Sequence, residues 1–233
     1  MPLPKIATPT YELELPSTGK TIKFRPFLVK EEKLLVLALE SNDTKEITNA
    51  IKAVLKDCIQ TRGIKVENLP TFDIEFLFLN IRGKSVGEDI EVSILCPDDG
   101  ETYAEVEISI DDIKVAKDDK HSTQIKIDEN LMMEMRYPSL DQFIKNNFDF
   151  TEQNAMEQSF DLIASCIDKI YTEDEVWATE DCSKKEIVEF LEQMNSSQFK
   201  EIEKFFETMP KLSHTITVRN PKTKKDNEIV IEG

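Results

Sequence analysis

The sequence predicts an α+β protein, and three patterns indicate this class. Segments with alternating apolar and polar residues, typical of β-hairpins, lie near both ends of the 233-residue chain. Between them, apolar residues recur at the three- and four-residue spacing of amphipathic helices. A further alternating stretch occupies the middle. We therefore expect two domains: residues 1–137, an α+β domain with a β-rich middle, and residues 138–233, a helical domain that ends in a β-hairpin.

The first predicted elements are a hairpin and two helices. Two alternating segments flank a four-residue turn and lead into a helix over residues 30–41, which contains the longest apolar run, Leu34 to Leu39. A second helix is predicted over 44–61 from its apolar spacing. Asp43 with Glu46 forms a capping-box pattern at its start.

A third helix, predicted over residues 72–81, is apolar on most sides. A helix that is hydrophobic all round is usually a central core element. We therefore expect a core position for it. The alternative is that its phenylalanines face a partner subunit.

The middle of the chain predicts two more hairpins. Their paired segments are 90–94 with 103–110 and 124–128 with 131–137. The first pair turns at Pro97-Asp-Asp-Gly100, which has typical turn residues. The charged stretch 111–122 is expected to be a loop.

The second half is mainly helical. Ser139 and Gln142 form a capping-box pattern, and a long helix is predicted over 151–171. Its apolar stripe consists of Met156, Phe160, Ile163, Ile167 and Ile170. A stripe this short indicates packing on a neighbouring helix rather than a coiled coil.

The last predicted elements are two helices and a hairpin. The helices begin at a capping box of Ser183 with Glu186 and at Ser196. The hairpin pairs residues 215–219 with 228–231.

Composition excludes several classes of protein. The chain has 39% hydrophobic and 32% charged residues, as ordinary globular proteins do. No apolar run is long enough to span a membrane, and the first residues lack the apolar region of a signal peptide. We therefore expect the protein to stay in the compartment where it is made. Cys58 and Cys166 fall on apolar helix stripes and are expected to be reduced, buried thiols.

Charge is strongly negative and unevenly distributed. The net charge of −17 argues against binding of duplex DNA, which depends on Lys and Arg. Residues 146–209 contain 16 acidic and 5 basic residues. The sign reverses near the C-terminus, where the basic residues are Arg219, Lys222, Lys224 and Lys225. Both regions are either solvated surface or surfaces complementary to charged partners.

No motif for catalysis or for binding of a cofactor occurs. The two histidines, His121 and His214, lack a cysteine or second histidine at metal-ligand spacing. There is no phosphate-binding glycine loop, serine hydrolase motif or calcium loop. The sequence thus predicts a protein that is not an enzyme, with no cofactor, metal or small-molecule substrate.

Two turns resemble zinc knuckles without their ligands. Cys96-Pro-Asp-Asp-Gly100 matches the pattern Cys-Pro-x-Cys-Gly except that Asp99 replaces the second cysteine. Asn220-Pro-Lys-Thr223 has a comparable layout with no cysteine. The hairpins are either metal-free descendants of a zinc ribbon or two ordinary hairpins. Because a lone hairpin is marginal in water, each must pack on its own domain or on a partner.

The segment Phe24-Arg25-Pro26-Phe27 is a candidate contact site. Pro26 interrupts regular strand pairing, and aromatic and arginine residues are enriched at interface hot spots. Phe24, Arg25 and Phe27 are therefore candidate interaction residues, together with the basic residues near the C-terminus. The alternative is that the two rings cover the following helix.

Several blocks of the chain resemble the baseplate hub proteins of T-even-type contractile-tailed bacteriophages. The blocks are Tyr11-Glu-Leu-Glu-Leu-Pro16, Phe24-Arg-Pro-Phe27, Phe76-Leu-Phe-Leu-Asn-Ile-Arg-Gly-Lys-Ser85, Ile94-Leu-Cys-Pro-Asp-Asp-Gly100 and Leu212-Ser-His-Thr-Ile-Thr217. The Cys-Pro-Asp-Asp variant resembles that of phages of marine bacteria.

The resemblance implies a virion protein of the tail baseplate, present in the host cytoplasm during assembly. Its implied partners are other hub, spike, tape-measure or tail-tube proteins, with no nucleic acid and no membrane. Two alternatives remain: a tail-assembly chaperone absent from the mature virion, and a nucleic-acid-binding module derived from a zinc ribbon.

Overall fold

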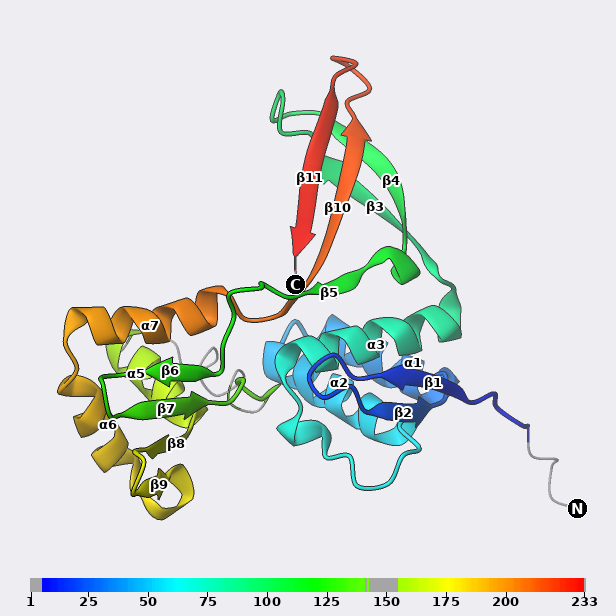
Figure 1. Ribbon diagram of the computed structural model, residues 1–233. Coiled ribbons are helices and arrows are strands. Elements are labelled where there is room, and N and C mark those ends of the chain that lie inside the picture. Colours follow the sequence, from blue (N-terminus) through cyan, green and yellow to red (C-terminus); the bar gives the residue numbers. More distant parts are fainter. Residues whose placement is uncertain (1–5, 141, 143–154, 233) are drawn as a thin grey trace, which may run out of the picture. The chain divides into compact units, whose positions relative to one another are not determined.

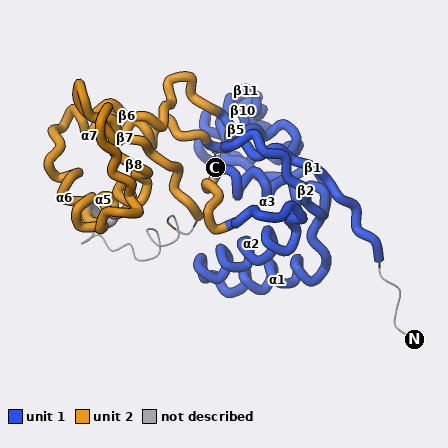
Figure 2. The backbone as a smooth tube through the Cα atoms, turned by 60° about the horizontal axis from the view of Figure 1, so that its bottom comes forward, with its two compact units in different colours: residues 1–66, 72–116, 211–233 blue, residues 67–71, 117–210 orange. Residues whose placement is uncertain are grey.

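The computed structural model describes residues 6–140, 142 and 155–232, and it confirms the α+β class. The chain forms two compact units, shown in different colours in Figure 2. Unit 1 comprises residues 1–66, 72–116 and 211–233, and unit 2 comprises residues 67–71 and 117–210. This division differs from the expected boundary after residue 137. The reason is that strand β10 (Lys211–Arg219) pairs with β5 (Lys114–Ala116), so the C-terminal hairpin belongs to unit 1.

The helical part of unit 1 begins with the predicted hairpin. Its elements are β1 (Tyr11–Glu14), β2 (Thr21–Phe24), α1 (Val29–Glu40), α2 (Thr44–Cys58), the short 3₁₀ helix η1 (Val66–Asn68), whose last two residues fall in unit 2, and α3 (Thr71–Val86). The hairpin turn closes through the N–H of Leu15, which donates to the carbonyl of Lys20 at 3.0 Å. Gly19 has a φ of +68°, a conformation that glycine adopts without steric cost.

The cap predicted for α2 is confirmed in part, and the core position predicted for α3 is confirmed. The Asp43 side chain accepts hydrogen bonds from the N–H groups of Lys45 and Glu46 and so caps α2. In α3, Phe72, Leu77 and Ile81 are fully buried, which confirms the core interpretation of this helix. The buried carboxylate of Asp73 accepts hydrogen bonds from the N–H and hydroxyl of Ser17, and this ties α3 to the first hairpin.

The β-part of unit 1 contains two antiparallel hairpins and a short strand (Figure 1). Its elements are β3 (Asp89–Leu95), β4 (Tyr103–Ser109), the 3₁₀ helix η2 (Ile110–Asp112), β5, β10 and β11 (Asp226–Glu232). The expectation that the charged stretch 111–122 is a loop is wrong in part, because β5 lies within it. Three residues of β5 pair with Lys211–Ser213 of β10, a long-range pairing that local sequence does not predict.

Unit 2 combines a four-stranded antiparallel sheet, in the order β6-β7-β8-β9, with helices. Its elements are β6 (Gln124–Lys126), β7 (Met132–Met135), α5 (Ala155–Cys166), β8 (Ile167–Tyr171), β9 (Val176–Ala178), the 3₁₀ helix η4 (Thr179–Asp181), α6 (Lys184–Glu192) and α7 (Ser196–Glu207). As predicted, Ser183 and Glu186 form a capping box at α6.

One predicted helix ends earlier than expected. The apolar stripe extends through Ile167 and Ile170, but the chain leaves the helix after Cys166 and forms β8. In β8, Ile170 pairs with Met133 on one side and with Trp177 on the other, so pairing within the sheet prevails over helical spacing. The predicted start of this helix, residues 151–154, lies outside the described residues, as does the side chain of Met156.

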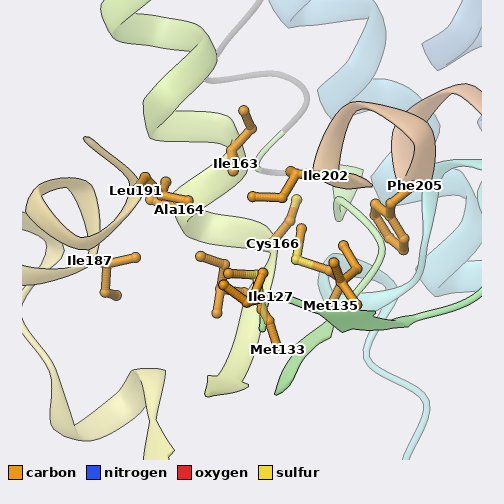
Figure 3. Close-up of a cluster of buried hydrophobic side chains, with 12 residues drawn as sticks. Ile127, Met133, Met135, Ile163, Ala164, Cys166, Ile187, Leu191, Ile202 and Phe205 are labelled. Atoms are coloured by element: carbon orange, nitrogen blue, oxygen red, sulfur yellow. The ribbon is translucent and has the colours of Figure 1, made fainter. Parts of the chain in front are cut away.

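The core of unit 2 is one apolar cluster (Figure 3). Its buried members come from the sheet, from the residue that follows β6 and from helices α5, α6 and α7, and they are Ile125, Ile127, Met133, Met135, Ile163, Ala164, Cys166, Ile167, Ile187, Leu191, Ile202 and Phe205. Cys166 here and Cys58 in unit 1 are fully buried, as expected for small apolar side chains.

His121 connects the start of unit 2 to this core. Its ring lies against Tyr137 and Phe205, with centroid distances of 5.6 and 5.2 Å. Its Nδ1 is 2.9 Å from the Thr208 hydroxyl, and its Nε2 is 3.0 Å from the Tyr137 hydroxyl. Burial lowers the pKa of this imidazole, against the opposing charge of Asp118.

Candidate protein-interaction site

The structure places Phe24 in the core. Its side chain is 1% exposed, and its ring lies 5.8 Å from that of Tyr11. Phe24 forms a β-bridge with Ile59, and the N–H of Arg25 donates to the Cys58 carbonyl at 3.0 Å, so this end of β2 is covered by the end of α2. Phe27 is half-buried, and its N–H donates to the Ser85 hydroxyl at 2.9 Å. Phe24 therefore lies in the core of its own unit, and its ring is not exposed for contact with a partner.

Arg25 binds a buried carboxylate within the same unit. Its Nη2 lies 2.9 Å from Oε1 of Glu31, whose side chain is only 3% exposed. The other Glu31 oxygen accepts the Leu28 N–H at 2.7 Å, so the carboxylate also caps its own helix. Burial opposes ionisation of Glu31, but the hydrogen bonds from Arg25, Leu28 and Lys30 outweigh it and lower its pKa to about 2. Arg25 is thus held by an internal ion pair.

The predicted basic residues lie together at the tip of the β10–β11 hairpin. Arg219, Lys222, Lys224 and Lys225 are all exposed. The loop that carries them is ordered by Asn220, whose side-chain oxygen accepts the N–H groups of Lys222 and Thr223 at 2.8 and 3.1 Å. Lys222 is also 3.4 Å from Glu101 of the β3–β4 loop.

Hydrogen bonds to Asp98 join this tip to the tip of the β3–β4 hairpin. Asp98 accepts from the side-chain amides of Asn220 and Asn227 at 2.7 and 3.1 Å, and also from the Thr223 hydroxyl. These bonds, with that of Thr223 contributing most, lower the pKa of Asp98. Both asparagines are buried, so the aspartate satisfies amide groups that would otherwise be unpaired.

The two tips share one turn hydrogen bond and one residue with a positive φ. The N–H of Gly100 donates to the Cys96 carbonyl at 3.0 Å, and the N–H of Lys224 donates to the Asn220 carbonyl at the same distance. Gly100 and Lys224 have φ values of +66° and +64°. Beneath the tips, Cys96 and Ala104 of one hairpin pack on Val218 of the other. The two turns that resemble zinc knuckles in sequence therefore also contact each other in the structure.

The residues of the tips do not fit a zinc ion. Cys96 supplies a single thiol, and burial, with the charges of Asp98 and Asp99, raises its pKa. The Asp99 carboxylate accepts hydrogen bonds from Thr102 and the Glu101 N–H. Among the described residues, no group of three or more His, Cys, Asp or Glu side chains is arranged to hold a metal. The two tips are joined by the hydrogen bonds to Asp98.

A family model described as T4 bacteriophage base plate protein matches residues 8–233 of the chain. The chain belongs to this family. It is a structural component of the phage baseplate, a part of the virion tail. Neither the curated proteins nor the solved structures include a significant match. Within the described part of this baseplate protein, no helix is both long and apolar enough to cross a membrane.

Sequence reasoning missed one exposed surface of this baseplate protein, the outward face of α1. Leu37 and Leu39 are more than half exposed there, whereas the acidic Glu31 is buried. The apolar run Leu34 to Leu39 contained the necessary information: six consecutive apolar residues surround a helix, and a helix packed on one side cannot bury them all.

Proposed function

We propose that this baseplate protein is a subunit of the baseplate hub, retained in the virion and acting through contacts with hub, spike, tape-measure or tail-tube proteins. The observation that carries the proposal is the family match over almost the whole chain, together with the hub-like blocks at residues 11–16, 24–27, 76–85, 94–100 and 212–217.

The basic tip of the β10–β11 hairpin is the contact site that we assign to this function. Arg219, Lys224 and Lys225 are exposed and form no ion pair with any described residue. The hydrogen bonds of Asp98 and Asn220 hold the loop in one conformation, which reduces the conformational entropy lost on binding. A protein of charge −17 that presents this basic tip is suited to an acidic patch on a neighbouring subunit.

Quantitative mass spectrometry of purified phage particles and isolated baseplates tests the hub role. A small fixed number of copies per particle, retained in baseplates, supports the proposal. Absence from both, with abundance in infected lysate, contradicts it and indicates the alternative of an assembly chaperone.

The tip is tested by charge reversal with a matched control. Arg219→Glu, Lys224→Glu and Lys225→Glu together should reduce incorporation into particles. The control variant, Lys45→Glu, Lys65→Glu and Lys200→Glu, changes the net charge equally at exposed sites elsewhere and should be incorporated normally. If both variants have wild-type thermal stability and are incorporated equally, the basic tip is not the contact site.

A further inference from the structure

Helix α1 exposes more apolar surface than an ordinary surface helix. Five of its twelve residues are aliphatic side chains that are at least 40% exposed: Val29, Leu34, Val36, Leu37 and Leu39. Single exposed apolar residues are normal in soluble proteins, but a contiguous group marks a contact surface. In Figure 2, α1 is the outermost helix of unit 1, with α2 between it and α3.

The outward row of α1 has the spacing of a helix–helix seam. Glu31 and Ala38 are the buried residues of the helix, so the opposite side faces solvent. On that side, Val29, Lys33, Val36 and Glu40 follow one another at intervals of four, three and four residues. Residues at these intervals form a single stripe along a helix, as in coiled coils.

A groove lies beside this row. It has a volume of about 350 Å³ and is lined by Leu34, Leu37 and Ala38 of α1 and by Glu46, Asn49, Ala50 and Ala53 of α2. The alanines leave room for aliphatic side chains from another helix. The row and the groove together form a surface with an apolar centre and charged ends.

The charges of this surface are complementary to a second copy of the same surface. In an antiparallel arrangement centred between Val36 and Leu37, Lys33 faces Glu40 of the partner subunit and Glu40 faces Lys33 of the partner subunit. Val36 then packs on Leu37 of the partner subunit at the centre. Neither Lys33 nor Glu40 forms an ion pair with any described residue, so both are available for this contact.

We propose that α1 is the seam of a symmetric, antiparallel homodimer of this protein. The contact is isologous, since each residue pair occurs twice about a twofold axis. The proposal is independent of the hub role. It explains why α1 carries opposite charges at the two positions that an antiparallel partner brings together.

Sedimentation equilibrium of the full chain, at low ionic strength and over a range of concentrations, tests the dimer. The wild type should dimerise. Lys33→Glu brings two negative charges together at both copies of the charge pair, and Glu40→Lys brings two positive charges together there. Each single variant should therefore bind itself at least about tenfold more weakly than the wild type.

Two combinations of these changes make the test specific. An equimolar mixture of the single variants restores opposite charges at both pairs and should form a heterodimer. The double variant Lys33→Glu with Glu40→Lys should dimerise like the wild type. Both positions are exposed, so the thermal stability of each variant at low concentration should be unchanged.

Two results would overturn the proposal. One is a wild type that stays monomeric at the highest soluble concentration. This result would contradict the dimer even if α1 bound a different protein. The other is a dimer that all single variants form equally, because the contact would then lie on another face. Val36→Arg puts a charge at the centre of the seam. It should abolish the dimer both in the wild type and in the double variant Lys33→Glu with Glu40→Lys.

Discussion

The two units of this baseplate protein are held together in different ways. Unit 2 has a large apolar cluster with members from its sheet and from helices α5, α6 and α7. Unit 1 contains every buried polar or charged residue found in the described part of the chain, and these are Glu31, Asp73, Asn220 and Asn227. Each of them connects segments: Glu31 joins β2 to α1, Asp73 is bonded to the first turn, and the two asparagines join the hairpin tips.

Two helices of equal length show the same contrast. In α7, Ile202 and Phe205 are buried and the charged residues are exposed. In α1, a carboxylate is buried and most aliphatic residues are exposed. The apolar residues of α7 are thus covered within its own unit. Most of those of α1 are not, which is the difference on which the proposed dimer rests.

The largest expected effect is in the core of unit 2. Phe205→Ala removes a ring that contacts His121, Tyr137 and Phe206. It should lower the free energy of unfolding by about 3–5 kcal/mol, the usual cost of a cavity from a buried aromatic residue. Urea denaturation, followed by fluorescence of the single tryptophan, Trp177 in unit 2, measures this. A loss below about 1 kcal/mol would contradict the role of the cluster.

The second effect is at the buried ion pair of unit 1. Glu31→Gln leaves Arg25 without its charged partner and should cost about 3 kcal/mol. Because folding lowers the pKa of Glu31 from 4.5 to about 2, the wild type has this stabilisation in full above pH 4.5 and loses it as the pH falls toward 2. Denaturation followed by circular dichroism at several pH values should show that the free energy of unfolding falls less in the variant than in the wild type below pH 4.5. Glu32→Gln, at the neighbouring exposed position, is the control and should change little.

The third effect is at the hairpin tips. Asp98→Ala leaves the buried amides of Asn220 and Asn227 without their acceptor and should lower the melting temperature by several degrees. Glu101→Ala, in the same loop but exposed, should have almost no effect. Addition of a metal chelator should leave the melting temperature of the wild type unchanged. A drop with chelator would show that a metal, rather than Asp98, joins the tips.

A smaller effect is expected from His121 in unit 2. Burial lowers its pKa below the ordinary value of 6.5, so the unfolded chain takes up the proton first. The stabilisation is therefore present above pH 6.5 and declines as the pH falls toward the lower folded value. Denaturation followed by Trp177 fluorescence should show this decline as the pH falls below 6.5. In His121→Gln the decline should be absent.

The smallest effect is on the surface of α1. Val36→Ala should change the free energy of unfolding by less than about 0.5 kcal/mol when measured at a concentration where the chain is monomeric. The outward position of Val36, which is 48% exposed, is the reason. A larger loss would show that Val36 packs within its own unit and would weaken the contrast with α7.

Local patterns predicted most elements, because capping residues and apolar spacing act over short distances. Asp43 and Ser183 cap the helices that follow them, as their patterns predict. The failures involve long-range pairing. Ile167 and Ile170 fit a helix and a strand equally well, and only their neighbours β7 and β9 decide between them. The three residues of β5 are too few to show a strand pattern in the sequence, and their pairing with β10 makes them a strand.

The candidate site was predictable in part for the same reason. Four basic residues close together in sequence had to share one tip. Burial of Phe24, however, depends on its bridge to Ile59, and the partners of Asp98 come from residues more than a hundred positions later. Such contacts are set by the tertiary structure, and no local pattern reveals them.

The composition of unit 1 from distant segments has a consequence for synthesis on the ribosome. Strands β3 and β4 emerge long before β10 and β11, with the whole of residues 117–210 made in between. During that interval Cys96 has no Val218 to pack against, and Asp98 has no amide partners. Unit 2 is continuous except for a few residues and can fold as it emerges. The hairpin of β3 and β4 therefore obtains its packing and hydrogen-bond partners only when β10 and β11 have been synthesised.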